Sequence, residues 1–120
     1  MQLEENLYHY RARVVSVFDG DTCTVDFDLG LYITLRKQTL RLARIDAPEL
    51  RGEEHEAGIR ARDALRDLIL DKDVLLRTFK DSKERYGRWL AEIWVKQPDG
   101  SYLNVNDWML NNGYARPYNP

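Results

Sequence analysis

The stretch that decides the fold is Tyr10-Arg-Ala-Arg-Val-Val-Ser-Val-Phe18, which is followed directly by Asp19-Gly20. Valine and phenylalanine favour β-strands, and Asp-Gly is a strong signal for a two-residue type I′ hairpin turn. After this turn, apolar and polar residues alternate from Thr22 to Leu29. Alternation of this kind predicts a second strand with one buried face, so we expect the chain to open with a β-hairpin.

Further strands are predicted on the C-terminal side of this hairpin. A turn near Leu29-Gly30 leads to a strand over 31–36, and Lys37-Gln38 predicts another turn before a strand over 40–45. Pro48 ends this run, because proline lacks the N–H donor that a sheet needs. The first part of the chain is therefore predicted to be a meander of three or four strands.

The rest of the chain is predicted to alternate between helix and strand. A helix from about Glu53 or Glu56 to Leu70 is indicated by apolar residues at helical spacing, namely Ala57, Ala61, Ala64, Leu65, Leu68 and Ile69. Asn104 can cap a short helix that ends before Gly113. The other predicted elements are strands over 74–80 and 89–95, a polar loop over 81–88 and a turn at Pro98-Asp99-Gly100.

The order β-β-β-α-β-β, with a late short helix, predicts a mainly β protein with helices, of the α+β class. This order is typical of the OB-fold, a five-stranded Greek-key barrel with a helix between its third and fourth strands, whose open face often binds oligonucleotides. A chain of 120 residues fits one such domain over 1–120 and leaves little room for a second.

Composition excludes several classes of protein. A single cysteine, Cys23, excludes an internal disulfide framework and a cysteine-rich zinc site, and two distant histidines disfavour zinc hydrolases and Ser-His-Asp enzymes. The net charge of −2 is not the basic footprint of a strong duplex-DNA binder. No apolar run approaches the ~20 residues of a membrane span, so we expect no membrane partner. No signal peptide is recognisable, which leaves the compartment open between a secreted or released enzyme and a cytoplasmic one.

Carboxylates and arginines remain as candidates for chemistry. Asp21 follows the first turn at the mouth of the predicted barrel, where a carboxylate is costly without a partner, although it could simply cap a backbone N–H. Asp46 and Glu49 flank Pro48 and can converge on one point, or else lie in a solvated loop. Arg41 suits bidentate contact with phosphate, and its alternative role is a structural ion pair.

These residues together suggest one kind of reaction. Arg88 alone would be an ordinary charged loop residue, but with Arg41 it can stabilise the charge on a phosphoryl transition state. The acids alone would repel a phosphodiester, so they imply a hard divalent cation held by oxygen ligands. A third acid can then act on the attacking water. The pattern therefore favours metal-assisted hydrolysis of phosphodiesters.

Four motifs, in this order, resemble those of the staphylococcal nuclease (thermonuclease) family. They are Asp19-Gly-Asp-Thr22, Arg41-Leu-Ala-Arg-Ile-Asp-Ala-Pro-Glu49, Tyr86-Gly-Arg-Trp-Leu-Ala91 and Asn112-Gly-Tyr-Ala115. The resemblance runs roughly from Arg11 to Tyr118. It implies an OB-fold barrel and a calcium-dependent endonuclease that acts on DNA and RNA and leaves 3′-phosphate and 5′-hydroxyl ends.

The resemblance also implies a role for each matching residue. Asp21 and Asp46 would bind Ca²⁺ with the backbone carbonyl of Ala47, and Glu49 would orient or deprotonate the attacking water. Arg41 and Arg88 would bind the phosphate. Arg85 and Tyr86 match positions near the terminal phosphate of a bound nucleotide, and Tyr118 is near the position of a tyrosine in the nucleotide pocket.

The chain departs from the family pattern in three places. Ala47 stands where threonine is common, the hairpin that contains Asp26 and Asp28 is longer and more acidic, and the sequence stops at Pro120 before the third helix of the founding enzyme. The alternative function is a non-catalytic OB module that binds nucleic acid or peptides. Such modules lack several of the acids and arginines, so the presence of all five charged side chains favours the enzyme.

Overall fold

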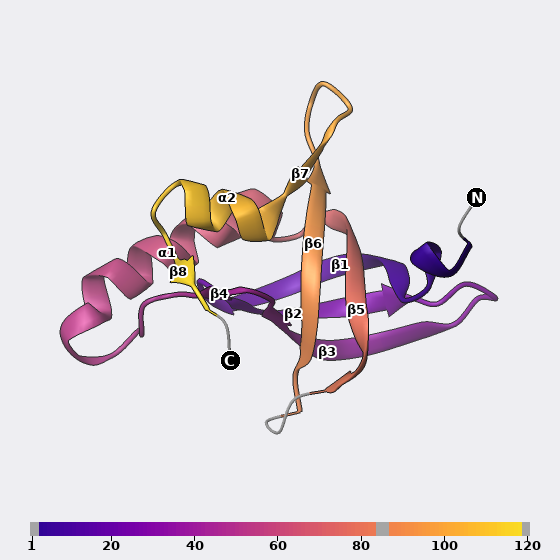
Figure 1. Cartoon of the computed structure of the whole chain (residues 1–120), viewed down its shortest axis with the longest axis horizontal. Coiled ribbons are helices and arrows are strands. Elements are labelled where there is room, and N and C mark those ends of the chain that lie inside the picture. The colour runs from indigo at the N-terminus through magenta and orange to yellow at the C-terminus, as the bar shows by residue number, and fades with distance from the viewer. Residues whose placement is uncertain (1–2, 84–86, 119–120) are drawn as a thin grey trace.

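The computed structural model describes residues 3–83 and 87–118, apart from the side chains of 80–83, and its main feature is a closed β-barrel (Figure 1). The barrel strands are β1 (His9–Asp19), β2 (Thr22–Asp28), β3 (Thr34–Leu42), β5 (Asp73–Lys83) and β6 (Trp89–Lys96). They are ordered β3-β2-β1-β5-β6, and a parallel pairing between β3 and β6 closes the barrel. The predicted OB-type α+β fold is confirmed.

Shorter elements decorate the barrel. They are a 3₁₀ turn at Leu3–Asn6, β4 (Ile45–Asp46), a 3₁₀ turn at Gly52–Glu54, α1 (His55–Ile69), β7 (Tyr102–Asn104), α2 (Val105–Asn111) and β8 (Arg116–Pro117). Strand β8 pairs with β4 as a separate two-stranded sheet. Strand β8 could not be predicted from the sequence, because a two-residue strand has no periodicity to detect.

Helix α1 covers one end of the barrel, as Figure 1 shows. Its buried positions are Gly58, Ala61, Leu65 and Ile69, which confirms the predicted helix and its apolar face. Leu65 and Ile69 are fully buried in the same hydrophobic cluster as the inward-facing residues of the barrel strands. Each buried side chain of this size contributes about 1.5–3 kcal/mol relative to an exposed one, so the helix is an integral part of the core.

Gly20, between β1 and β2, has a different role from the one predicted. A type I′ turn requires positive φ at both central positions, but neither Asp19 nor Gly20 has positive φ. The turn is instead centred on Gly20 and Asp21, since Asp19 pairs with Thr22. A Cβ at Gly20 would lie 2.7 Å from the Cβ atoms of both Ala47 and Ala61. Glycine is therefore required for close packing of the turn against α1 and the segment after β4.

The β2–β3 hairpin also differs from the prediction. Strand β3 starts at Thr34 and continues past Lys37, where the β2–β3 register shifts as in a β-bulge and no turn forms. Lys37 has a φ of 56°, and its N–H donates to Asp26 Oδ1 at 2.8 Å. The turn predicted near Leu29-Gly30 is present and is longer than expected, because it includes Gly30, Leu31 and Tyr32, all with positive φ. The strand predicted over 40–45 is interrupted after Leu42, where a turn separates β3 from β4. The long hairpin uses its acidic residues structurally, and Asp28 Oδ1 likewise accepts the N–H of Gly30 at 2.8 Å.

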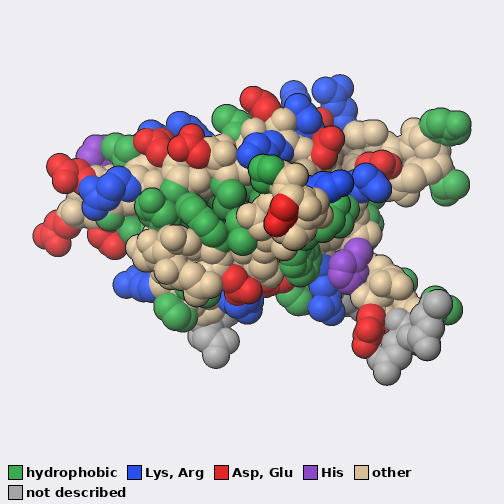
Figure 2. Space-filling view, turned by 90° about the horizontal axis from the view of Figure 1, so that it is seen from above, with side chains coloured by type: hydrophobic (Ala, Val, Ile, Leu, Met, Phe, Trp, Pro, Cys, Tyr) green, Lys and Arg blue, Asp and Glu red, His purple; other side chains and the backbone are tan. Residues whose placement is uncertain are grey.

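The C-terminal half agrees more closely with expectation. Asn104 caps α2 by accepting the N–H of Asp107 at 2.9 Å, and Gly113 follows the helix with a φ of 77°. Strand β5 continues to Lys83, so the loop predicted over 81–88 begins later than expected. In the described ranges, no helix is both long and apolar enough to cross a membrane. Figure 2 shows basic and acidic side chains interspersed over one face, in keeping with the small net charge.

Candidate active site

Asp21 is held at the end of the barrel by backbone and side-chain hydrogen bonds. Only 6% of the residue is exposed. Its Oδ2 accepts the backbone N–H of Ala47 at 2.9 Å, and its Oδ1 accepts the hydroxyl of Thr22 at 3.0 Å. The turn itself is capped by Asp19, whose Oδ1 accepts the N–H of Asp21 at 3.0 Å. Asp21 therefore accepts a backbone N–H, which was one of its two expected roles. That N–H belongs to Ala47, in the distant segment after β4.

The surroundings of Asp21 disfavour its charged form. Burial raises its pKa to about 6, and the neighbouring carboxylate of Asp19 adds to the rise. The N–H of Ala47 and the charge of Arg41 act in the opposite direction and only partly compensate. The ionised carboxylate of Asp21 is therefore only partly compensated by the groups around it.

Arg41, near the end of β3, links the two aspartates. Its Nη1 donates to the carbonyls of Leu42 at 2.9 Å and Ile45 at 2.8 Å, which fixes the plane of the guanidinium. Its Nη2 lies 3.3 Å from Asp21 Oδ2 and 3.4 Å from Asp46 Oδ1. Because both carboxylates contact one nitrogen, they lie within a few ångströms of each other. The structural ion pair expected as one role of Arg41 is therefore present, with both acids as partners, and its phosphate-binding role stays a prediction.

The C-terminal strand β8 completes this side of the site. Arg116 donates through Nε and Nη2 to Asp46 Oδ2, at 3.1 and 2.9 Å. The ring of Tyr118 lies over the guanidinium of Arg41, with Cζ 5.7 Å from the ring centroid. This distance is within the range of a cation–π contact. Tyr118 is therefore beside the predicted phosphate-binding arginine, and half of it is exposed.

Glu49 and Arg88 lie next to the segments that carry Asp46 and Arg41. Glu49 is exposed and lies three residues after Asp46, and its carbonyl packs so closely on Gly58 of α1 that a Cβ there would overlap it. Arg88 is half-buried and directly precedes β6, where parallel pairing sets Leu90 opposite Arg41. Arg85 and Tyr86 lie outside the described residues.

A second set of contacts, which the sequence analysis missed, anchors the turn between β3 and β4. Arg44 has a φ of 69° and contacts Glu92 Oε1 at 2.7 Å, Glu92 Oε2 at 2.9 Å and Asp107 Oδ1 at 2.7 Å. The buried Asn106 donates to the carbonyls of Ala43 at 2.9 Å and Ala91 at 3.0 Å. These contacts bind the segment that carries Asp46 to β6 and α2. Arg44 lies inside the 41–49 motif but was given no role there, and Asn106 was assigned only to a helix.

The oxygen groups at this end of the barrel fit a hard divalent cation. Asp21 and Asp46 supply two converging carboxylates, and the backbone of Ala47 adjoins Asp21. Carboxylate and carbonyl oxygens are the ligands that Ca²⁺ prefers, and a cation would relieve the uncompensated charge around Asp21. Among the described side chains, which leave out those of 80–83, no three His, Cys, Asp or Glu cluster at metal-binding spacing, so a cation here would need backbone or water ligands as well.

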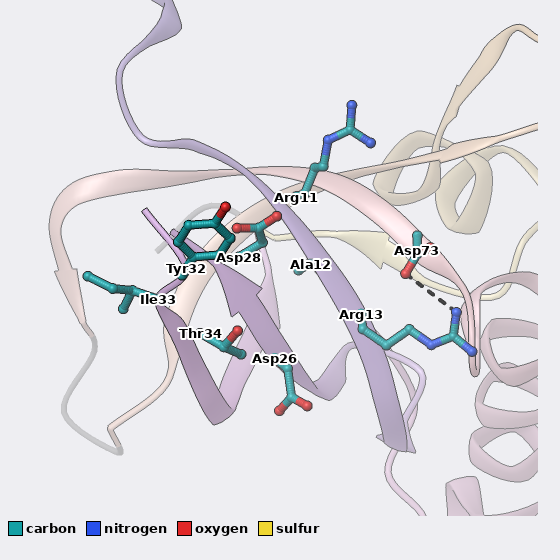
Figure 3. A pocket seen from close by; sticks show the side chains of 9 residues that line it. All are labelled: Arg11, Ala12, Arg13, Asp26, Asp28, Tyr32, Ile33, Thr34 and Asp73. Carbon is teal, nitrogen blue, oxygen red and sulfur yellow. Dashed lines mark hydrogen bonds and ion pairs between the residues drawn. The ribbon is translucent and has the colours of Figure 1, made fainter. Parts of the chain in front are cut away.

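One cavity lies away from the candidate site, and a smaller one borders it. A cleft of about 590 Å³ lies between β1, β2 and the hairpin turn and contains none of the predicted site residues. Figure 3 shows its mixed lining, with Asp26 and Asp28 from β2, Tyr32 from the turn and an ion pair between Arg13 and Asp73. A much smaller cavity of about 170 Å³ borders the candidate site and is lined in part by Asp46, Glu54 and Arg116.

Comparison with known proteins identifies related chains. The family model described as "Staphylococcal nuclease homologue" matches residues 39–120. The chain is similar to a thermonuclease of Staphylococcus hyicus, at 34% identity over 87% of this chain and 57% of that protein. It is also similar to endonuclease Htp3 of Saprolegnia parasitica, at 30% identity over 90% of this chain and 56% of that protein.

An uncharacterized protein of Methanocaldococcus jannaschii is 28% identical over 92% of this chain and 60% of that protein. The chain thus spans somewhat more than half the length of each of these relatives. The matched segment 39–120 contains Arg41, Asp46, Glu49 and Arg88, but begins after Asp21.

Proposed function

Since this chain belongs to the staphylococcal nuclease family, we propose that it is a calcium-dependent endonuclease that hydrolyses phosphodiester bonds of DNA and RNA. The observation that carries this proposal is the convergence of Asp21 and Asp46 on a single nitrogen of Arg41. Two acids and an arginine at one point provide both a cation site and a phosphate site. The relatives named thermonuclease and endonuclease support the same class of reaction.

In this proposal, Asp21, Asp46 and the backbone carbonyl of Ala47 hold the calcium ion. When bound, Ca²⁺ would supply positive charge that attracts the phosphate and stabilises the charge developing on it. The protein keeps Asp21 in position for this role through the hydrogen bonds from Ala47 and Thr22. Because both donors come from buried residues, Thr22 in β2 and Ala47 after β4, little reorganisation is needed when the cation binds.

The remaining charged residues act on the substrate. Arg41 is held through Nη1 by two carbonyls, and its Nη2 contacts both acids. A cation bound by the acids would replace these Nη2 contacts, and Nη2 would then be available for a phosphate oxygen. Arg88 contributes a second positive charge to the same phosphate. Glu49, exposed beyond Pro48, orients or deprotonates the water that attacks phosphorus. The 5′ oxygen then leaves, which gives 3′-phosphate and 5′-hydroxyl ends.

Nucleotide binding is proposed for the residues around this phosphate. Tyr118 packs over Arg41 and offers an aromatic face at the site, while Arg85 and Tyr86 contact the terminal phosphate. The net charge of −2 makes a broad electrostatic grip on DNA unfavourable. We therefore expect binding to depend on local contacts and to be less sensitive to salt than in a strongly basic nuclease.

Cleavage assays with matched variants test this function. Plasmid DNA, heat-denatured DNA and RNA would be incubated with the parent protein in calcium, in magnesium and in chelator. We expect calcium-dependent cleavage that falls by about a hundredfold or more in Glu49→Ser and Arg88→Ala, in line with the usual contributions of a general base and a charge-stabilising group. End-labelling of the products checks for 3′-phosphate ends.

Glu56→Ser, which makes the same change at an exposed residue of α1, is the matched control and should cleave like the parent. Full activity in Glu49→Ser would contradict the assigned mechanism. A folded parent that binds calcium and nucleic acid but cleaves neither DNA nor RNA would instead favour the non-catalytic OB module.

A further inference from the structure

We propose that Arg116 is a positioning residue that fixes the carboxylate of Asp46 for cation binding. This inference rests on the proposed function, because it concerns one of the two carboxylates that would hold calcium. It assigns a role to β8, a strand that the sequence analysis did not anticipate. Arg116 also lies outside the set of residues implied by the family motifs.

The register of the small β4–β8 sheet sets Arg116 directly opposite Asp46. Two nitrogens of the guanidinium, Nε and Nη2, donate to the same oxygen, Asp46 Oδ2. The other oxygen, Oδ1, lies 3.4 Å from Arg41 and faces the side of Asp21. Rotation of the carboxylate about its Cβ–Cγ bond would break the two-donor contact. Arg116 therefore holds Oδ1 toward the site, where a cation would replace the contact with Arg41.

Strand β8 is itself anchored, so Arg116 approaches Asp46 from a fixed backbone. The N–H of Tyr118 donates to the carbonyl of Arg44 at 2.8 Å. Arg44 is in turn held by Glu92 and Asp107. The ring of Tyr118 packs over Arg41, which joins the end of the strand to the other side of the site. One short segment thus contacts both Asp46 and Arg41.

The exposure of Arg116 indicates that its geometry matters more than its charge. Its side chain is 73% exposed, against 28% for Asp46, and water screens a charge in that setting. The pKa of Arg116 is raised, first by its hydrogen bonds to Asp46 and then by the charges of Asp46 and Glu54, so the group stays protonated. Its charge alone would weaken cation binding by repulsion. A positioning role therefore predicts the opposite sign from a purely electrostatic one.

Calcium titration of the metal-free protein by calorimetry separates these roles without any cleavage assay. The variants are Arg116→Lys, which keeps the charge but loses the paired donors, and Arg116→Gln, which removes the charge. We expect calcium affinity to fall about tenfold in both, the lower end of the usual effect of residues that orient metal ligands. In cleavage, the calcium concentration for half-maximal rate should rise while the rate at saturating calcium stays near that of the parent.

Arg13→Lys and Arg13→Gln are matched controls, because Arg13 also faces a register-paired aspartate, Asp73, away from the site. Their calcium affinity should equal that of the parent. Affinity in either Arg116 variant equal to or tighter than in the parent would overturn the positioning role and leave the proposed function standing. A parent that binds no calcium at millimolar concentrations would overturn both proposals.

Discussion

The two aspartates that meet at Arg41 are held in opposite ways. Asp21 belongs to the barrel: its side chain is 9% exposed, and backbone and hydroxyl donors fix it. Asp46 belongs to the two-residue strand β4 at the edge of the barrel: its side chain is 28% exposed, and its two oxygens contact Arg41 and Arg116. Burial and hydrogen bonds at the end of the barrel therefore hold Asp21, whereas ion pairs, one of them from the C-terminal segment, hold Asp46.

This difference has an energetic consequence. A buried carboxylate loses hydration, and its hydrogen bonds compensate only in part, which is why the pKa of Asp21 rises to about 6. The carboxylate of Asp46 keeps more contact with water and has two cationic partners. Because of its burial, ionised Asp21 opposes folding. The position of the Asp46 carboxylate depends instead on its contacts with Arg41 and Arg116.

Replacing Asp21 by Asn gives the largest expected effect, because it removes the buried charge and keeps the shape. Calcium binding and cleavage should fall by two or more orders of magnitude, since an oxygen anion that attracts the cation is lost. The metal-free fold should nevertheless become more stable at neutral pH by about 2–3 kcal/mol, because one pKa unit corresponds to ~1.4 kcal/mol. The amide oxygen of Asn can still accept the N–H of Ala47. Urea unfolding and calcium titration measure the two effects.

The pH dependence provides the control for this prediction. The pKa of Asp21 is raised in the folded state from 3.8 to about 6, so its contribution to stability is present below about pH 4 and is lost as pH rises through about 6. In chelator, the stability difference between Asp21→Asn and the parent should therefore be small near pH 4 and largest above pH 7. A difference that does not vary with pH would mean that Asp21 ionises normally in the folded protein.

The second-largest effect is expected from weakening the contacts of Arg44, which hold the segment that carries Asp46. In Arg44→Gln, the largely buried Glu92 loses two hydrogen bonds and is left with the donor from Asn104. Breaking one partner of a poorly hydrated ion pair should destabilise the fold by about 1–3 kcal/mol, measured by urea unfolding. Arg44→Lys, which keeps the charge but lacks the planar fork, should recover only part of the loss. Equal stability of all three proteins would mean that charge pairing does not hold this region.

The same contrast explains what the sequence could predict. Asp21 was expected at the mouth of the barrel because it shares the alternation of Cys23, Val25 and Phe27, all of which are buried. That local period also predicted the hairpin, as the spacing of α1 predicted its buried face. The support of Asp46 could not be predicted this way, because Arg116 meets it through a pairing of residues 70 positions apart. Gly20 was misjudged for a similar reason: its neighbours Ala47 and Ala61 come from distant segments.

The smallest expected effect on stability is that of Arg13→Gln. This variant tests whether every ion pair stabilises the fold or only the pairs that are shielded from water. Arg13 and Asp73 face each other across β1 and β5, as Arg116 and Asp46 do across their sheet, but one contact of 3.4 Å joins them and their side chains are 52% and 82% exposed (Figure 3). Water screens such a pair, so a double-mutant cycle with Asp73→Asn should give a coupling below about 0.5 kcal/mol. A coupling as large as that between Arg44 and Glu92 would show that burial does not separate the two regions. The contrast between Asp21 and Asp46 would then have to come from backbone geometry alone.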